Sequence, residues 1–313
     1  MTAILADIGA TSARFGLQID TEPTLIHTYA VADHASPIDA ARVYLAGPAA
    51  GHKPDTGVIA AAGPVVNGRV SMTNAAWTVD ADRIRQGLGL RSVKVINDFE
   101  ALGWALPGLK PADLVAIGQG GPAEPGTMAV MGPGSGFGLA AMATDGAAEI
   151  VLVTEGGHAT LSSENRREDA IILALRERLH HVSVERVLSG PGLVQLYQSI
   201  AAIDQLTVPQ RSSAEIVQHA LAGDCETSRT TLEAFCAFLG SVAGNVALSL
   251  GARGGLFIGG GIAPRFTDFL RQSAFRERFE AKGRMSSYLA RIPTSVIVHP
   301  FPAFVGLARL ARM

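Results

Sequence analysis

The segment Asp7-Ile8-Gly9-Ala10-Thr11-Ser12 decides how the chain begins to fold. A short apolar run precedes it, Ala3–Ala6, and another follows it, Phe15–Leu17. Two apolar runs joined by a few small residues are typical of a β-hairpin. We therefore expect the chain to open with two antiparallel strands joined by a tight turn.

The same arrangement recurs about 125 residues further along the chain. Met128–Met131 leads into the glycine-rich segment Gly132–Gly138, and the apolar run Leu139–Met142 follows. A supersecondary unit that occurs twice indicates two related halves, each opening with a hairpin.

Further strands and helices alternate between and after the two hairpins. Apolar runs predict buried strands at 57–63, 92–96 and 255–258. Apolar residues at helical spacing predict helices at 99–106, 168–179 and 232–250, and Gly251 is the predicted stop of the last one. This alternation predicts an α/β architecture.

Composition and charge exclude several classes of protein. The 313 residues are 48% hydrophobic and 17% charged, which is typical of a globular protein with a buried core. The formal net charge of −2, without a block of like charges, argues against a nucleic-acid partner. Two cysteines are too few for a disulfide framework, and Cys236 lies on the apolar face of a predicted helix. We find no signal peptide and no uninterrupted apolar run of membrane-spanning length, so we expect a cytoplasmic protein without a membrane partner.

The glycine-rich turns are candidate phosphate-binding loops. A polyphosphate needs several converging backbone N–H donors, and bulky side chains would keep it away from them. Neither turn is a Walker A or a dinucleotide-binding loop, since the Gly-Lys-Ser/Thr ending is absent and a strand follows each turn. Each turn alone is compatible with an ordinary hairpin. Together with a third glycine cluster, Gly259–Gly261, they favour a nucleotide site.

Asp7, at the end of the first predicted strand, has two interpretations. It can serve as a turn-forming residue. It can also hold a hydrated Mg²⁺ near the phosphates, since this cation prefers carboxylate oxygens and keeps much of its water shell.

Asn97 and Asp98 lie between a predicted buried strand and a predicted helix. Open α/β sheets bind their ligands at the carboxyl ends of strands, which favours a catalytic role. The start of a helix is also where an aspartate serves as the N-cap, with its carboxylate turned toward backbone N–H groups. The helix dipole favours the anionic form that a general base needs. From the local sequence alone, cap and base are equally good interpretations of Asp98.

The segment Glu155-Gly156-Gly157-His158 is a candidate sugar-binding motif. Its carboxylate and imidazole can converge on a polyol, whose hydroxyls need both donors and acceptors. A single histidine near a strand end is more commonly structural, and no second His or Cys lies at the spacing of a metal site. Glu185, taken alone, is equally well explained as a solvated surface charge.

In their order along the chain, these motifs resemble the bacterial glucokinases of the non-zinc type, within the superfamily of sugar kinases, Hsp70 and actin. The cysteine-rich zinc signature of the other bacterial sugar-kinase family is absent. The matching segments span nearly the whole chain: Asp7–Arg14, Met72–Trp77, Ile96–Phe99, Gly132–Gly138, Glu155–His158, Glu185–Gly192 and Gly259–Ile262.

The resemblance implies a role for each matching residue. Asp98 would be the catalytic base, acting on the 6-hydroxyl of D-glucose. Substrate would be bound by Asn97, Asp98, Glu155, His158, Glu185, Gly134 and Ser135, the last two through the phosphates. The ATP site would comprise Ala6, Asp7, Ile8, Gly9, Ala10, Thr11, Gly132, Gly136, Gly259, Gly260, Gly261 and Ile262, with Mg²⁺ held by Asp7 through water.

The resemblance also implies an architecture. We expect a two-domain actin-like or hexokinase-like ATPase fold with the active site in the interdomain cleft. A small α/β domain would comprise 1–109 plus 300–313, a large α+β domain 110–299, and two chains would form a homodimer. A kinase for another hexose and a non-catalytic, nucleotide-dependent sugar sensor on the same fold remain alternatives. The first loop departs from the family pattern, because Ala10 replaces a glycine and its methyl group restricts the backbone.

Overall fold

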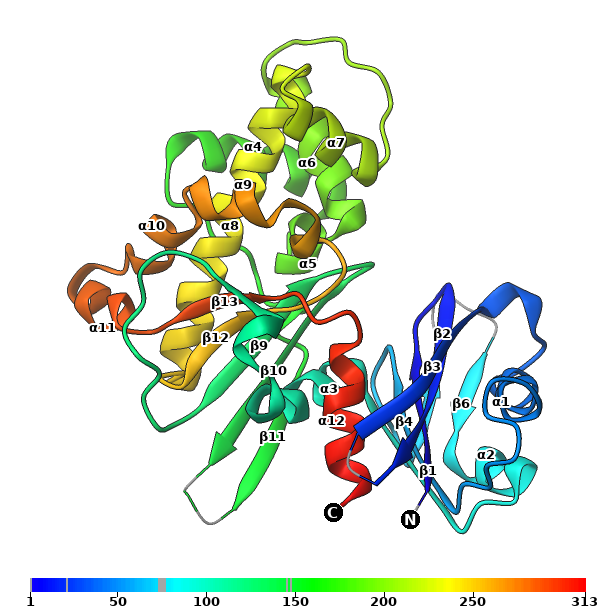
Figure 1. Ribbon diagram of the computed structural model, residues 1–313. Coiled ribbons are helices and arrows are strands. Elements are labelled where there is room, and N and C mark those ends of the chain that lie inside the picture. The colour runs from blue at the N-terminus through cyan, green and yellow to red at the C-terminus, as the bar shows by residue number, and fades with distance from the viewer. Residues whose placement is uncertain (1, 21, 73–76, 145, 147) are drawn as a thin grey trace. The chain divides into compact units, whose positions relative to one another are not determined.

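The computed structural model describes residues 2–20, 22–72, 77–144, 146 and 148–313 (Figure 1). The chain divides into two compact units. Unit 1 comprises Met1–Lys110, Val151–Val153 and His299–Met313, and unit 2 comprises Pro111–Ile150 and Thr154–Val298. Part of the family-like motif Met72–Trp77, residues 73–76, lies outside the described residues.

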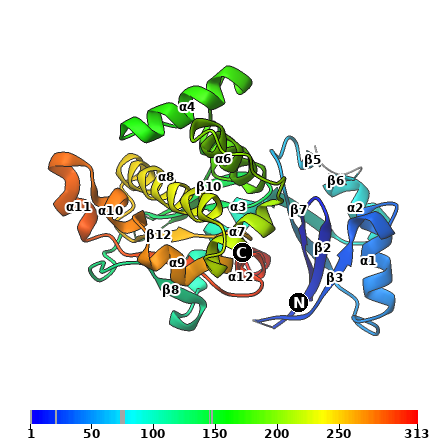
Figure 2. The same cartoon turned by 90° about the horizontal axis from the view of Figure 1, so that it is seen from above.

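Unit 1 is built on a five-stranded sheet of order β3-β2-β1-β4-β7. Helices α1 and α2 lie on one side of this sheet, and α3 and α12 lie on the other (Figure 2). A two-stranded sheet is formed by β5 and β6. The elements are β1 Ala3–Ile8, β2 Ser12–Ile19, β3 Glu22–Ala30, α1 Pro37–Ala46, β4 Thr56–Ala61, β5 Arg69–Ser71, β6 Thr78–Asp80, α2 Ala81–Leu88, β7 Ser92–Asn97, α3 Asp98–Ala105 and α12 Pro302–Ala311.

The register of the sheet places three strand ends side by side. Strands β1 and β2 form the predicted antiparallel hairpin, whereas β1, β4 and β7 run parallel. Ile8 pairs with Ala61, and Ala61 pairs with Asn97. The first hairpin turn and Asp98 therefore follow strand ends at the same sheet edge, two strand spacings or about 10 Å apart.

Unit 2 contains a six-stranded sheet of order β11-β10-β9-β12-β13-β8, whose edge strand β11 includes the residues Val151–Val153 that group with unit 1. As in unit 1, the sheet contains an antiparallel hairpin, here β9-β10. The first strand of the hairpin pairs in parallel with β12, and β12 pairs in parallel with β13. The two predicted hairpins are confirmed. The elements are β8 Leu114–Ala116, β9 Met128–Pro133, β10 Phe137–Thr144, β11 Glu149–Thr154, α4 Arg166–Leu179, α5 Val184–Val187, α6 Gly190–Ile203, α7 Ser213–Ala222, α8 Glu226–Leu250, β12 Gly255–Ile258, α9 Thr267–Gln272, α10 Phe275–Glu280, α11 Ser286–Ala290 and β13 Thr294–Ile297.

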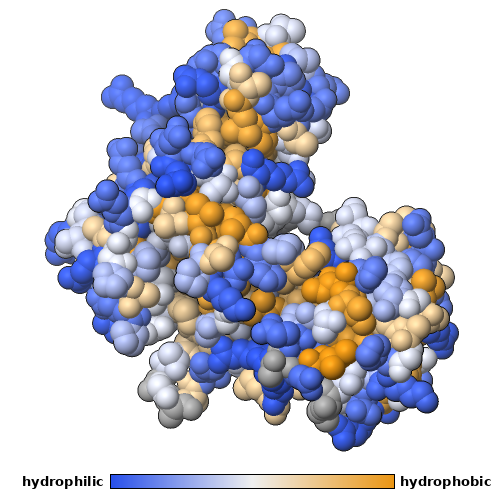
Figure 3. Space-filling view, in the orientation of Figure 1, coloured by the Kyte–Doolittle hydropathy of each residue, from blue (hydrophilic) through white to orange (hydrophobic). Residues whose placement is uncertain are grey.

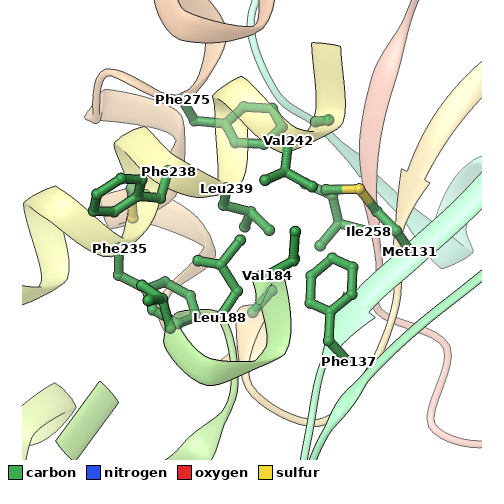
Figure 4. Packing of buried hydrophobic residues seen from close by; sticks show 14 of the residues in the cluster. Met131, Phe137, Val184, Leu188, Phe235, Phe238, Leu239, Val242, Ile258 and Phe275 are labelled. Carbon is green, nitrogen blue, oxygen red and sulfur yellow. The ribbon is translucent and has the colours of Figure 1, made fainter. Parts of the chain in front are cut away.

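The long helix α8 organises the core of unit 2. It begins at Glu226, earlier than its apolar spacing predicts, because Cys225 adopts extended backbone as the N-cap, and it ends at the left-handed Gly251 as predicted. Helices α6, α7 and α10 pack around it. Its buried face meets side chains of α5, α10 and the sheet (Figure 4).

Helix α8 is long and apolar enough to cross a membrane by length and composition. However, 72% of an apolar stretch of 18 residues in this helix is buried inside the structure, as expected of a core helix. In the view of Figure 3, hydrophilic side chains surround several hydrophobic areas.

The last helix, α12, packs closely on α3, which begins at Asp98. A Cβ at Gly306 of α12 would overlap the carbonyl oxygen of Ala101 in α3. Only glycine therefore allows the two helix backbones to approach this closely. The tail of the chain thus supports the helix that carries the candidate base.

We predict that Gly306→Ala destabilises the protein by about 1–3 kcal/mol, because the added methyl group overpacks the α3–α12 contact. Alanine is the better helix former, so propensity alone would give the opposite sign. The urea midpoint measures the effect. The control is Gly87→Ala in α2, where the nearest atoms to the new methyl belong to the Ile38 side chain, at 3.0 Å, rather than to a backbone carbonyl. Equal stability of the wild type and Gly306→Ala would refute this account of the contact.

Candidate functional site

The first glycine-rich turn is a tight hairpin turn in unit 1. Gly9 donates its N–H to the carbonyl oxygen of Ser12 over 2.9 Å, so Ala10 and Thr11 form the tip. The carbonyl of Thr11 accepts a hydrogen bond from Val31, at 3.0 Å. Ala10 does not have a positive φ, so its methyl group causes no backbone strain in the turn. The alanine that replaces the family's glycine therefore does not restrict the backbone conformation of this turn.

Asp7 lies in β1, directly opposite Arg14 of β2. The Arg14 Nη1 atom donates to Asp7 Oδ2 over 2.8 Å. Burial raises the pKa of the Asp7 carboxyl, and the charge and hydrogen bond of Arg14 oppose that shift. The neighbouring Ala6 and Ile8, which the resemblance assigns to the ATP site, are fully buried in this structure.

The donor set at Asp7 fits a loosely held magnesium ion. Within the described ranges, no three His, Cys, Asp or Glu side chains gather into a metal site. A single carboxylate suits Mg²⁺, which keeps several waters and takes further oxygens from substrate phosphates.

The structure separates the two interpretations of Asp98. The N-cap of α3 is Asn97, whose Oδ1 accepts hydrogen bonds from Phe99 N at 2.8 Å and Glu100 N at 3.3 Å. Its Nδ2 donates to the carbonyl oxygen of Gly63 over 3.0 Å. Asp98 is the first residue of the helix, and its Oδ1 lies 3.0 Å from Phe99 N. The cap interpretation therefore applies to Asn97.

In unit 2 the second and third glycine clusters meet at the carboxyl ends of β9 and β12. A Cβ at Gly132 would overlap the carbonyl oxygen of Gly259, and one at Gly260 would overlap that of Pro133. Gly260 also has a φ of +82°, which favours glycine. Gly261 is exposed, with open space beside its Cα. These glycines are needed so that two backbone segments can lie against each other.

The tip of the second hairpin contacts the start of α6. Gly134 donates to the carbonyl oxygen of Gly136 over 2.8 Å, and its own carbonyl accepts from Gly190 N, the first residue of α6, at 2.9 Å. Ser135 is exposed between them. A Cβ at Gly190 would lie 3.9 Å from Ile262 Cδ1. Gly192 N at the helix start donates to Ser189 Oγ, so the N–H groups of Gly190 and Gly192 are both bonded within the protein and the exposed loop tip at Ser135 is the part that faces solvent.

Glu185 lies against this loop. Helix α5 buries Val184 and Val187, and the carboxylate of Glu185 between them accepts a hydrogen bond from Phe137 N at 2.8 Å. A Cβ at Gly136 would overlap this carboxylate. Figure 4 shows Phe137 and Val184 pointing into the same core. The surface-charge interpretation of Glu185 is therefore wrong.

Glu155 and His158 lie on a short 3₁₀ turn that packs on the same strand end. A Cβ at Gly157 would overlap the carbonyl oxygen of Phe137. His158 Nε2 lies 3.8 Å from Glu155 Oε2, and the two side chains are 62% and 64% exposed. Unit 2 thus places the Glu155–His158 turn and the Glu185 carboxylate against the backbone of Phe137.

Three contributors were not assigned a role from the sequence. The carbonyl of Gly63 and the N–H of Phe137 are backbone groups, and their residue types give no signal. Gly190 had a signal: Pro191 directly after it is typical of a helix start, where a phosphate is readily bound.

Comparison with known proteins identifies the family. The Glucokinase family model matches residues 4–313. A glucokinase of Paramagnetospirillum magneticum is 45% identical over 309 residues, which cover 98% of this chain and 96% of that protein. The chain belongs to the glucokinase family.

Solved glucokinases share the fold. The glucokinase from an Antarctic psychrotroph has a TM-score of 0.89 and 38% identity, with 99% of this chain and 98% of that chain covered. The glucokinase of Balamuthia mandrillaris, solved with glucose, has a TM-score of 0.84 at 18% identity, covers 100% of this chain and 94% of its own, and shows the fold alone. The predicted family, actin-like fold class and function as an ATP-dependent glucokinase are confirmed. The residue roles and domain limits stay predictions.

We predict that Asp7→Asn makes the nucleotide-free glucokinase more stable at neutral pH. Because the pKa of Asp7 is raised in the folded state, the folded protein binds its proton more tightly than the unfolded chain does. The carboxyl therefore lowers stability as the pH rises through that pKa, whereas asparagine stays neutral. The urea midpoints of the variant and the wild type should agree near pH 4 and separate toward pH 8. Arg14→Gln should steepen the loss seen in the wild type, and a less stable Asp7→Asn at pH 8 would contradict the prediction.

We predict that Gly136→Ala raises the KM for glucose by about tenfold or more. The methyl group would displace the Glu185 carboxylate and break its hydrogen bond to Phe137 N, and such a bond to a charged group contributes about 1.5–3 kcal/mol. Gly134→Ala is the matched control, since no atom lies within 4 Å of its Cβ position. In steady-state kinetics, the glucose KM of this control should lie within about twofold of the wild-type value. An equal shift in both variants would assign the effect to the loop rather than to Glu185.

Proposed function

We propose that this glucokinase transfers the γ-phosphoryl group of ATP to the 6-hydroxyl of D-glucose, with Asp98 as the general base. The observation that carries the proposal is the cap made by Asn97. Since Asn97 makes the capping hydrogen bonds to Phe99 and Glu100, Asp98 lies in the first turn of α3 rather than at its cap, with one oxygen accepting from Phe99 N. The helix dipole stabilises the anion at this first position.

The acceptor sugar is held by polar side chains with both donor and acceptor capacity. Glu155, His158 and Glu185 supply carboxylates and an imidazole for its hydroxyls. Glu185 already accepts one hydrogen bond, but a carboxylate has about four acceptor sites. Asn97 has one amide N–H left beside the one given to Gly63, and that donor is assigned to the sugar.

The phosphates lie against backbone N–H groups. In unit 1 these belong to the turn at Gly9–Thr11, and in unit 2 to the loop around Gly134–Gly136. Mg²⁺, held through water by Asp7, would neutralise charge on the phosphate oxygens. The protein itself mainly positions the reactants and stabilises charge, as is general in phosphoryl transfer.

Three further assignments accompany the function. Units 1 and 2 are proposed as the small and large domains, with limits 1–109 plus 300–313 and 110–299. The enzyme is proposed to act in the cytoplasm as a homodimer. Family resemblance supports these assignments, and sedimentation at micromolar concentration tests the dimer.

We predict that Asp98→Asn lowers kcat at least about 10²-fold, because general-base catalysis typically contributes that much. The isosteric amide keeps the helix start, so nucleotide affinity, measured with a fluorescent ATP analogue, should change little. A coupled assay of ADP release over glucose, fructose, mannose and glucosamine, with a no-sugar control, identifies the acceptor. Near-normal turnover of the variant would remove Asp98 as the base. ADP release that does not depend on sugar would remove the kinase reaction altogether.

A further inference from the structure

A short antiparallel pairing joins the two segments of unit 2 that carry the proposed sugar-binding side chains. At its centre, Thr160 and Ser183 form an isolated bridge. Two backbone hydrogen bonds flank the bridge, from Leu161 N to the carbonyl oxygen of Val182 at 3.0 Å and from Val184 N to that of Ala159 at 2.9 Å. We call residues 159–161 and 182–184 together the clamp.

One strand of the clamp continues directly from the turn that carries Glu155 and His158. Two hydrogen bonds close this turn, from His158 N to the carbonyl oxygen of Glu155 at 3.0 Å and from Ala159 N to that of Gly156 at 3.2 Å. Ala159 thus belongs to both structures, because its N–H closes the turn and its carbonyl accepts from Val184 N. A displacement of the turn would therefore stretch the clamp.

The other strand of the clamp continues into α5, which carries Glu185. Ser183 is the N-cap of this four-residue helix, and its Oγ accepts a hydrogen bond from Arg186 N at 3.3 Å. Ser183 is buried, with an exposed fraction of 4%. A helix of one turn has few hydrogen bonds of its own, so it depends strongly on its cap. Val184, which follows the cap, points into the core of unit 2 (Figure 4).

Phe137 completes a closed ring of contacts with the clamp. Its N–H donates to the Glu185 carboxylate over 2.8 Å. Its carbonyl oxygen lies so close to Gly157 of the turn that a Cβ there would overlap it. Two separate paths, one through Phe137 and one through the clamp, therefore fix the distance between the Glu185 carboxylate and the turn.

The chain enters the clamp through a residue with an unfavourable backbone conformation. Helix α4 ends at Leu179, and its C-cap His180 has φ +60° and ψ −59°. A residue with a side chain rarely adopts such a conformation, and the strain persists only where the surrounding structure imposes it. Next to it, the Nε2 atom of His181 lies 3.1 Å from Thr160 Oγ1. The strained turn thus leads into the contacts that hold the clamp together.

We propose that Ser183 is a positioning residue for the sugar. By capping α5 it maintains the clamp, and with it the distance between the Glu185 carboxylate and the His158 imidazole. This inference rests on the proposed function, which assigns both groups to hydroxyls of glucose. Since a polyol is held by donors and acceptors that match its hydroxyls, a loosened cap should weaken sugar binding and leave the transfer step at Asp98 nearly unchanged.

The kinetic test uses Ser183→Ala in the full chain. Exchange of an N-cap serine for alanine typically weakens a helix start about fivefold. We expect the KM for glucose to rise about threefold to tenfold and kcat to stay within about twofold of the wild type. Ser183→Thr keeps a capping hydroxyl and should restore the KM. The matched control is Ser212→Ala, the same substitution at the N-cap of α7, which should leave the glucose KM unchanged. A wild-type glucose KM in Ser183→Ala would overturn the proposal.

Deoxyglucoses distinguish positioning from a general loss of active enzyme. Each analogue lacks one of the hydroxyls other than the 6-hydroxyl, and its KM is measured with the wild type and with Ser183→Ala. Where the missing hydroxyl is one that Glu185 or His158 binds, the substitution should raise the KM less than it does for glucose, because that contact is already lost. An equal rise for glucose and for every analogue would show that Ser183 does not position these groups.

Amide hydrogen exchange tests the clamp without any enzyme activity. In Ser183→Ala, exchange in the turn at 155–159 should become several-fold faster, although the turn lies across the clamp from the substitution. Ser212→Ala should leave exchange in the turn unchanged. Unchanged exchange in Ser183→Ala would overturn the role of the clamp. If the wild type shows no sugar-dependent ADP release, the proposed function fails, while the exchange rates still decide whether Ser183 holds the turn.

Discussion

One amide side chain fixes the catalytic edge of the first unit. The Asn97 side chain joins the end of β7, the start of α3 and the chain beyond β4 through three hydrogen bonds. Each of these contacts satisfies a backbone group that would otherwise lack a partner at a strand or helix end. Because the cap is supplied one residue earlier, Asp98 enters the helix in its first turn, where the dipole stabilises its charge.

In the second unit, glycines at the strand ends take the place of a capping side chain. Two parallel strands, β9 and β12, end beside each other, and the chains beyond them touch backbone to backbone at Gly132, Gly259 and Gly260. The contacts there are between backbone groups, as in the hydrogen bond from Gly259 N to the carbonyl oxygen of Met131. The two units thus share a topology, a hairpin followed by two parallel strands, but a polar side chain lies at one strand end and close-packed glycines lie at the other.

The sequence predicted this topology well and the site only in part. Both hairpins, the strand before Asn97 and the helix α8 follow from apolar spacing and glycine stops, which are local signals. The identity of the capping residue could not be predicted from the sequence, since asparagine and aspartate both cap helices. The contact that holds the Asn97 side chain in place, its hydrogen bond to the carbonyl oxygen of Gly63, is distant in the sequence. Glu185 was ambiguous for a related reason: its partner is the backbone N–H of Phe137, 48 residues away, and backbone donors have no residue signature.

The contact between Glu185 and Phe137 has a consequence for how the substrates interact. The carboxylate assigned to the sugar is bonded to the first residue after the loop assigned to the phosphates. The Glu155–His158 turn packs on the carbonyl of that same residue. A sugar that draws Glu185 toward its hydroxyls should therefore weaken the hydrogen bond from Phe137 N and disturb the adjacent Gly136. Binding free energies are reciprocal, so a nucleotide that fixes the loop must change sugar affinity by the same factor.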